Sequence, residues 1–158
     1  MFVYPLLTLR RPRLTRDLLA YRYRRLEAAR AAAQAVGVSG AMFPWQSGSD
    51  GREETPTQLL NLISGTWLAD NSHRQRHVGL AVAYSVIQYQ QATGAMGFLA
   101  EAGGELLIEI CRLFADLAVH DPGDDRFHID TVMGPDEFHD GYPANPAAAS
   151  ATTLTPTS

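Results

Sequence analysis

The sequence predicts an all-α chain in which long loops separate the helices. Three segments place apolar residues at helical spacing, and the stretches between them are polar and rich in glycine. The composition, 46% hydrophobic and 19% charged over 158 residues, is that of one soluble globular domain. We therefore expect a helical domain whose loops carry its function.

The three helices are predicted over residues 15–37, 71–94 and 95–120. Thr15 is a suitable N-cap for the first, and a glycine stands at the end of each of the first two. The middle of the second is apolar nearly all round, which is typical of a helix buried on several sides. In the third, Gly103-Gly104 predicts a break or kink.

Charge is distributed unevenly along the chain. Eight of the thirteen arginines lie between Arg10 and Arg30, whereas residues 101–158 hold eleven carboxylates. The arginines alternate with leucine and alanine, which indicates a solvated helix face, so we expect no nucleic-acid partner. The apolar opening, residues 1–9, is too short to span a bilayer, so no membrane partner is expected either.

Cysteine usage and the absence of a recognisable export signal predict a cytoplasmic location. Cys111 is the only cysteine, so no intrachain disulfide can form. The arginines follow the first apolar run, whereas a secretory signal carries its charge before that run.

Two loops hold the candidate chemistry. Residues 42–55 read Met-Phe-Pro-Trp-Gln-Ser-Gly-Ser-Asp-Gly-Arg-Glu-Glu-Thr, and residues 132–143 read Val-Met-Gly-Pro-Asp-Glu-Phe-His-Asp-Gly-Tyr-Pro. An aromatic face and an amide, such as Trp45 and Gln46 offer, are suited to binding sugars. Cleavage of a glycosidic bond requires a carboxylic acid that protonates the leaving oxygen, and Glu137 is a candidate. Spacing alone, however, favours a plain core role for Trp45.

Other polar residues have simpler interpretations. His73 and His77 are four residues apart and could ligate a metal, but the residues between them lack the glutamate of a zinc protease helix. A structural role is favoured, and no metal is predicted. Glu53 and Glu54 are interpreted as solvated loop carboxylates.

Together with Asp70-Asn-Ser-His-Arg-Gln-Arg-His-Val78 and Gln88-Tyr89, the two loops resemble the central catalytic domain of glycoside hydrolase family 65. That family contains maltose, trehalose and kojibiose phosphorylases and some trehalose hydrolases. The resemblance covers Phe2 to Pro143, and it implies a partial (α/α)6 barrel over residues 1–143 with sugar bound in the loops at one end. It further implies that Glu137 is the general acid and that Trp45 and Gln46 contact the sugar.

The activity that this resemblance implies is inverting phosphorolysis of an α-glucosidic disaccharide. One carboxylic acid suffices, because phosphate itself attacks the anomeric carbon. Phosphate is then a co-substrate, and no further cofactor is expected. Two alternatives stay open: a trehalose-type hydrolase of the same family, and an inactive product or non-catalytic helical sugar-binding module. The sequence predicts neither the disaccharide nor the oligomeric state.

The resemblance also implies a fragment. The family has a Lys-Gln-Ala-Asp element near the substrate, and this sequence contains no lysine. We therefore expect the isolated chain to be inactive. The tail, residues 144–158, consists largely of Ala, Thr, Ser and Pro and is predicted to be disordered. Our hypothesis for its origin is a frameshift near Asn145, because a shifted reading of permitted codons gives a string resembling the family's continuation.

Overall fold

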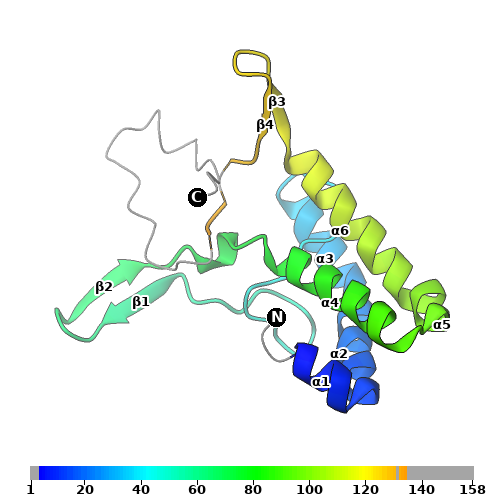
Figure 1. The fold of residues 1–158 in the computed structure, drawn as a ribbon. Coiled ribbons are helices and arrows are strands. Elements are labelled where there is room, and N and C mark those ends of the chain that lie inside the picture. The colour runs from blue at the N-terminus through cyan, green and yellow to red at the C-terminus, as the bar shows by residue number, and fades with distance from the viewer. Residues whose placement is uncertain (1–3, 131, 135–158) are drawn as a thin grey trace.

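The computed structural model describes residues 4–130 and 132–134, and most of these are helical (Figure 1). Two short β-hairpins accompany the helices. The mainly helical class is confirmed, and the hairpins correct the all-α prediction. Within the described residues, no helix has both the length and the apolar character needed to cross a membrane. Glu137 and the tail at 144–158 lie outside the described residues.

The N-terminal part contains three helices, α1 (Tyr4–Arg10), α2 (Pro12–Arg24) and α3 (Leu26–Ala35). The prediction of one helix over 15–37 was wrong, because the backbone leaves helical geometry at Arg25, with φ −108° and ψ 12°. Arg25 instead donates from Nε to the Ser49 carbonyl at 2.8 Å. Such a contact with a distant loop leaves no trace in apolar spacing.

Thr15 is not the N-cap that the sequence predicted. It lies inside α2, completely buried, and its hydroxyl accepts a hydrogen bond from Thr8 at 3.3 Å. The helix begins instead at Pro12, whose fixed φ and missing N–H suit the first helical position.

The second predicted helix begins later than expected. A short 3₁₀ turn, Ser72–Arg74, precedes α4 (Val78–Thr93). The predicted end is confirmed, because Gly94 caps α4 in the left-handed conformation at φ 65°. α4 is not buried on several sides, since Leu80, Tyr84 and Ile87 form an exposed stripe along it.

Gly103-Gly104 does not break the third helix. α5 (Met96–Phe98) continues through a π-helical turn, Leu99–Gly103, into α6 (Gly104–Leu117). A π turn absorbs one extra residue without stopping the helix, so the glycines here allow a local widening. The helix ends at Leu117, and the last predicted residues, 118–120, lead into a strand.

Both hairpins lie at places where the sequence predicted loops or a helix end. β1 (Gln58–Asn61) pairs antiparallel with β2 (Thr66–Ala69), and β3 (Val119–Asp121) pairs antiparallel with β4 (Arg126–His128). Each strand has only three or four residues, too few for an alternating pattern to be distinguished from a loop. Both hairpins project from the helical body (Figure 1).

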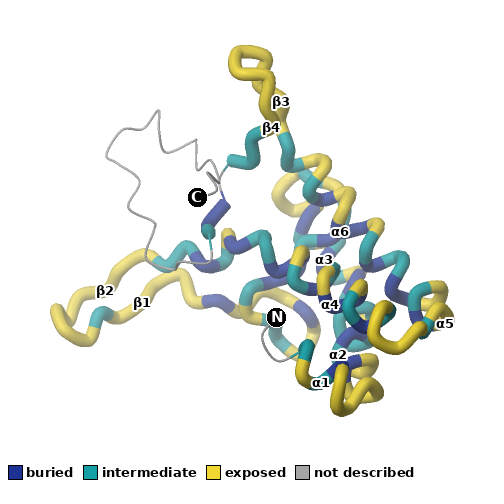
Figure 2. Tube along the Cα trace, viewed as in Figure 1, coloured by how far each residue is buried: buried dark blue, intermediate teal, exposed yellow. Residues whose placement is uncertain are grey.

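The core lies between the packed helices α2, α3, α4 and α6, as the dark segments of Figure 2 show. Leu19, Val86 and Leu106 are completely buried there. Phe43 and Ala41, from the loop after α3, belong to the same cluster. The hairpins are almost entirely exposed. The core therefore holds the beginning of the first candidate loop against the helices.

Candidate functional site

The first candidate loop starts from two backbone anchors. The Ala41 N–H donates to the Glu109 carbonyl of α6 at 3.0 Å, and the Met42 N–H donates to the Ala29 carbonyl of α3 at 2.9 Å. Phe43 is 3% exposed. The chain therefore leaves the core at a fixed position just before Trp45, which is half-buried, and Gln46, which is exposed.

One carboxylate organises the turn that holds these two residues. Glu53 accepts hydrogen bonds from the backbone N–H of Trp45 at 2.8 Å and of Gln46 at 3.1 Å. It also accepts from the N–H of Thr55 at 3.2 Å and from its hydroxyl. The Glu54 N–H donates to the Gln46 carbonyl at 2.9 Å and closes the loop. The interpretation of Glu53 as a merely solvated carboxylate was therefore wrong.

α2 supports the far side of the same loop. The Tyr21 hydroxyl lies 2.7 Å from both the Ser47 hydroxyl and the Gly48 carbonyl, and Arg25 binds the Ser49 carbonyl. Two side chains of the arginine-rich segment thus support a loop of candidate function. The sequence had suggested only a solvated face for this segment.

His77 joins the first loop to the second. Its ring centroid lies 5.8 Å from that of Trp45, with the ring planes tilted by 59°. Burial lowers the pKa of His77, and a hydrogen bond with the Met133 backbone opposes part of that shift. The Met133 N–H also donates to the Arg74 carbonyl at 3.1 Å. Residues 72–77 therefore connect Trp45 to the start of the second loop.

The second loop is described as far as Gly134. Val132 and Met133 are each 5% exposed, so the chain is well packed as far as Met133, four residues before Glu137 in the sequence. The predicted acid Glu137 and its neighbour Asp136 fall outside the described residues. The structure brings Trp45 together with His77 and Met133, and it shows Gln46 beside Trp45 on the same turn.

Within the described part of the chain, His73 and His77 do not belong to a group of side chains placed to bind a metal ion. The group of possible ligands found there is Asp121, Asp124 and His128, on the exposed β3–β4 hairpin. His128 Nε2 already lies 3.0 Å from an Asp124 carboxylate oxygen.

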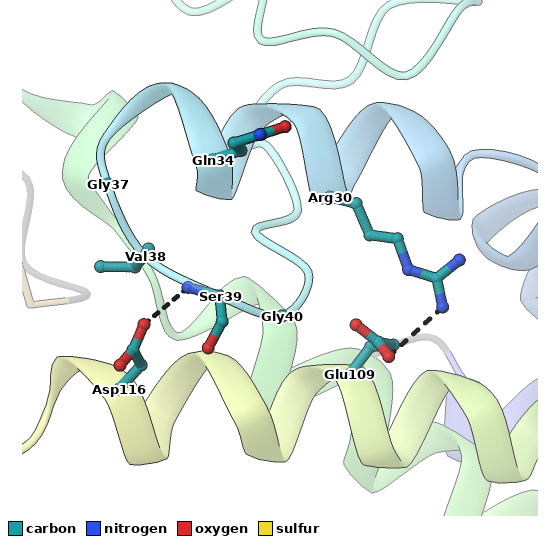
Figure 3. Close-up of a pocket in the computed structure, with 8 residues that line it drawn as sticks. All are labelled: Arg30, Gln34, Gly37, Val38, Ser39, Gly40, Glu109 and Asp116. Carbon is teal, nitrogen blue, oxygen red and sulfur yellow. Dashed lines mark hydrogen bonds and ion pairs between the residues drawn. The ribbon is translucent and has the colours of Figure 1, made fainter.

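An open groove of about 580 Å³ lies between α3 and α6 (Figure 3). Its polar groups bind one another, because Arg30 pairs with Glu109 and the Ser39 N–H donates to Asp116 at 2.6 Å. None of its lining residues belongs to the cluster of Trp45, His77 and Met133. The geometry therefore favours the loop cluster as the functional site.

The profile of the glycosyl hydrolase family 65 central catalytic domain matches residues 1–151. The chain belongs to this family of carbohydrate-active enzymes. The cluster of Trp45, His77 and Met133 thus lies within a sequence region that the family uses as its catalytic domain.

Several named relatives are similar over nearly the whole chain. An uncharacterized glycosyl hydrolase of Mycobacterium tuberculosis is 54% identical over 92% of this chain and 11% of its own length. The trehalose 6-phosphate phosphorylase of Lactococcus lactis is 46% identical over 90% of this chain and 18% of its own. The chain therefore spans between 11% and 18% of these relatives.

A solved structure of a putative kojibiose phosphorylase from the human microbiome has a similar fold. The alignment has a TM-score of 0.70 and 27% identity, and it covers 85% of this chain and 18% of that one. The helical arrangement described above is thus found in a solved protein of similar sequence.

Proposed function

We propose that this chain supplies the sugar-binding loop and the general acid of an inverting α-glucoside disaccharide phosphorylase. The proposal rests on two contacts of His77. Its ring centroid lies 5.8 Å from that of Trp45, and it is hydrogen-bonded with the Met133 backbone. His77 thereby connects the loop that offers sugar-binding groups to the segment that runs into Gly134-Pro135-Asp136-Glu137.

In this proposal the reaction needs one acid from the chain. Glu137, protonated, gives its proton to the glycosidic oxygen as the bond from that oxygen to the anomeric carbon breaks. A phosphate oxygen attacks the anomeric carbon from the opposite face. The products are β-glucose 1-phosphate and the released acceptor sugar, so the configuration is inverted.

The other residues position the sugar. The ring of Trp45 offers an apolar face for the C–H surface of a glucose unit, and the exposed amide of Gln46 offers hydrogen bonds to its hydroxyls. Asp136 is a neighbour of the acid and takes no separate catalytic role. Inorganic phosphate is the co-substrate.

The named relatives support a proposal for the substrate class. Those most similar include a trehalose 6-phosphate phosphorylase, kojibiose phosphorylases and a 1,2-α-glucosylglycerol phosphorylase. Their common group is an α-linked glucose. We therefore propose an α-glucosidic disaccharide of the trehalose, maltose or kojibiose type as substrate.

A chimera tests the proposal. Residues 1–144 of this chain replace the corresponding segment of the Lactococcus lactis phosphorylase, and the chimera is assayed on trehalose 6-phosphate, trehalose, maltose and kojibiose. Formation of β-glucose 1-phosphate that needs phosphate and disappears in Glu137→Gln supports the proposal. Free glucose formed without phosphate would indicate a hydrolase instead, and unchanged activity of Glu137→Gln would refute the role of the acid.

A non-catalytic sugar-binding module is the second candidate, favoured by the anchored turn that holds Trp45 and Gln46, whose side chains are suited to binding sugars. It predicts that the purified chain binds a disaccharide while the Glu137-containing chimera shows no turnover.

A further inference from the structure

We propose that Glu53 is the positioning residue of the sugar-binding loop, residues 42–55. Its carboxylate fixes the backbone of Trp45 and Gln46 and so sets their orientation toward the sugar. The inference rests on the proposed function only for the identity of the ligand. The placement of the loop itself depends on contacts that the structure shows.

The hydrogen bonds converge on the two oxygens of one side chain. One oxygen accepts from the Trp45 N–H at 2.8 Å, and the other accepts from the Gln46 N–H at 3.1 Å and from Thr55. A carboxylate is suited to this task, because it is an acceptor at both oxygens and charge strengthens each bond. An amide would have one acceptor oxygen and would place an NH₂ group against a backbone N–H.

Glu53 also spans the loop. The Glu53 backbone forms an antiparallel β-bridge with Ser47. Its side chain binds Thr55, which is buried. Its negative charge favours the charged state of Arg76, which burial disfavours, so it also acts on the segment that carries His77. The carboxylate therefore connects both ends of the loop and lies near the segment that joins it to the second loop.

Glu54 provides a matched comparison. It is the next residue, it carries the same charge and it is exposed. Its side chain takes part in none of the hydrogen bonds found among the described residues, whereas that of Glu53 accepts four. If Glu53→Gln and Glu54→Gln have different effects, the difference therefore comes from the hydrogen bonds that Glu53 makes and not from the loss of one negative charge.

The experiment follows the fluorescence of Trp45. The chain has two tryptophans, so Trp67→Phe leaves Trp45 as the only one. Glu53→Gln, Glu53→Asp and Glu54→Gln are prepared in that background. Circular dichroism establishes that each variant is folded, and acrylamide quenching without any sugar reports the exposure of Trp45. Titration with trehalose, maltose and kojibiose gives the affinity.

For Glu53→Gln we expect easier acrylamide quenching, an unchanged helical spectrum and disaccharide affinity that is lower by about tenfold. Glu53→Asp, which keeps the charge, should restore part of both readouts, and Glu54→Gln should resemble the parent. Unchanged quenching in folded Glu53→Gln, or an equal effect of Glu54→Gln, would overturn the inference. If the parent binds no disaccharide but its Glu53→Gln variant shows increased quenching, the positioning role stands and the proposed ligand is wrong.

Discussion

At the scale of single residues, His77 connects the two candidate loops through its contacts with Trp45 and the Met133 backbone. Burial favours its neutral form, because a charged imidazolium loses hydration there. The residue therefore links the geometry of the site to pH. The sequence interpretation of a structural histidine is consistent with these contacts.

We expect acidification to destabilise the fold through His77. Its folded pKa is lowered below the value of the unfolded chain, so the unfolded state binds more protons in that interval. This contribution to stability is complete above about pH 6.5 and is lost as pH falls through the folded pKa. Urea unfolding at about pH 7.5 and about pH 5.5 measures the effect. The free energy of unfolding should fall between the two pH values in the parent and should fall less in His77→Gln. Equal losses in the two proteins would contradict this account.

Gly40 is a second residue with a measurable role. It has φ +83°, and a Cβ there would lie 2.4 Å from the Glu109 carbonyl oxygen and from the Leu113 nitrogen. Gly37, in the same loop, has φ +81°, but a Cβ added to it would meet no other atom within 4 Å. We expect Gly37→Ala to cost about 1 kcal/mol from backbone strain.

Gly40→Ala should cost roughly 2 kcal/mol more than Gly37→Ala, because the steric conflict adds to the same strain. Chemical denaturation of both variants measures the difference. Equal losses would show that α6 does not approach Gly40 as closely as described.

At the scale of elements, α3 and α6 are joined by an ionic network. Glu109 is buried on α6, with 7% of its side chain exposed, and it accepts from Arg112 at 2.6 Å and lies 3.3 Å from Arg30 of α3. Arg30 also binds Glu105 at 2.7 Å. The Ala41 anchor is made to the Glu109 carbonyl, so this network supports the start of the first candidate loop.

Glu109→Gln should lower the free energy of unfolding by about 2 kcal/mol, because it removes a charge that two arginines bind. Glu101→Gln is the matched control, since the Arg16–Glu101 pair is exposed at both ends. An exposed pair of this kind contributes under about 0.5 kcal/mol. Thermal unfolding compares the two, and a control loss as large as that of Glu109→Gln would argue against the network.

The sequence predicted the elements with strong helical periodicity and missed those that depend on distant contacts. The end of α4 at Gly94 was predictable because a glycine in the left-handed conformation is a local feature. The break at Arg25 depends on a loop that lies 24 residues away, and the carboxylate of Glu53 finds its partners only after the loop has folded. The signal that could have indicated Glu53 is its place within the same candidate loop as Trp45 and Gln46.

At the scale of the whole molecule, the β1–β2 hairpin presents apolar side chains to solvent. Leu62 is 87% exposed, Ile63 is fully exposed and Trp67 is 64% exposed. Among the residues that the structure describes, the sheet consists of these two strands, so each strand has one edge that no described strand pairs with. Unpaired edges with exposed apolar residues favour association between chains.

We expect the purified chain to self-associate as its concentration rises. Replacing Leu62 and Ile63 together by aspartate should shift the sedimentation profile toward the monomer. Gln58→Glu adds a charge to the same hairpin without removing an apolar group, and it should have a smaller effect. A monomer at all concentrations would show that this surface does not drive association.

We propose that the Trp45 loop and the segment running into Glu137 form one sugar site. A crystal structure of the chain with an α-glucosidic disaccharide would show this site. We expect a glucose ring against Trp45 and a Glu137 carboxylate oxygen within about 3.2 Å of the glycosidic oxygen. A disaccharide bound in the groove between α3 and α6, or Glu137 held away from a sugar that contacts Trp45, would contradict the claim.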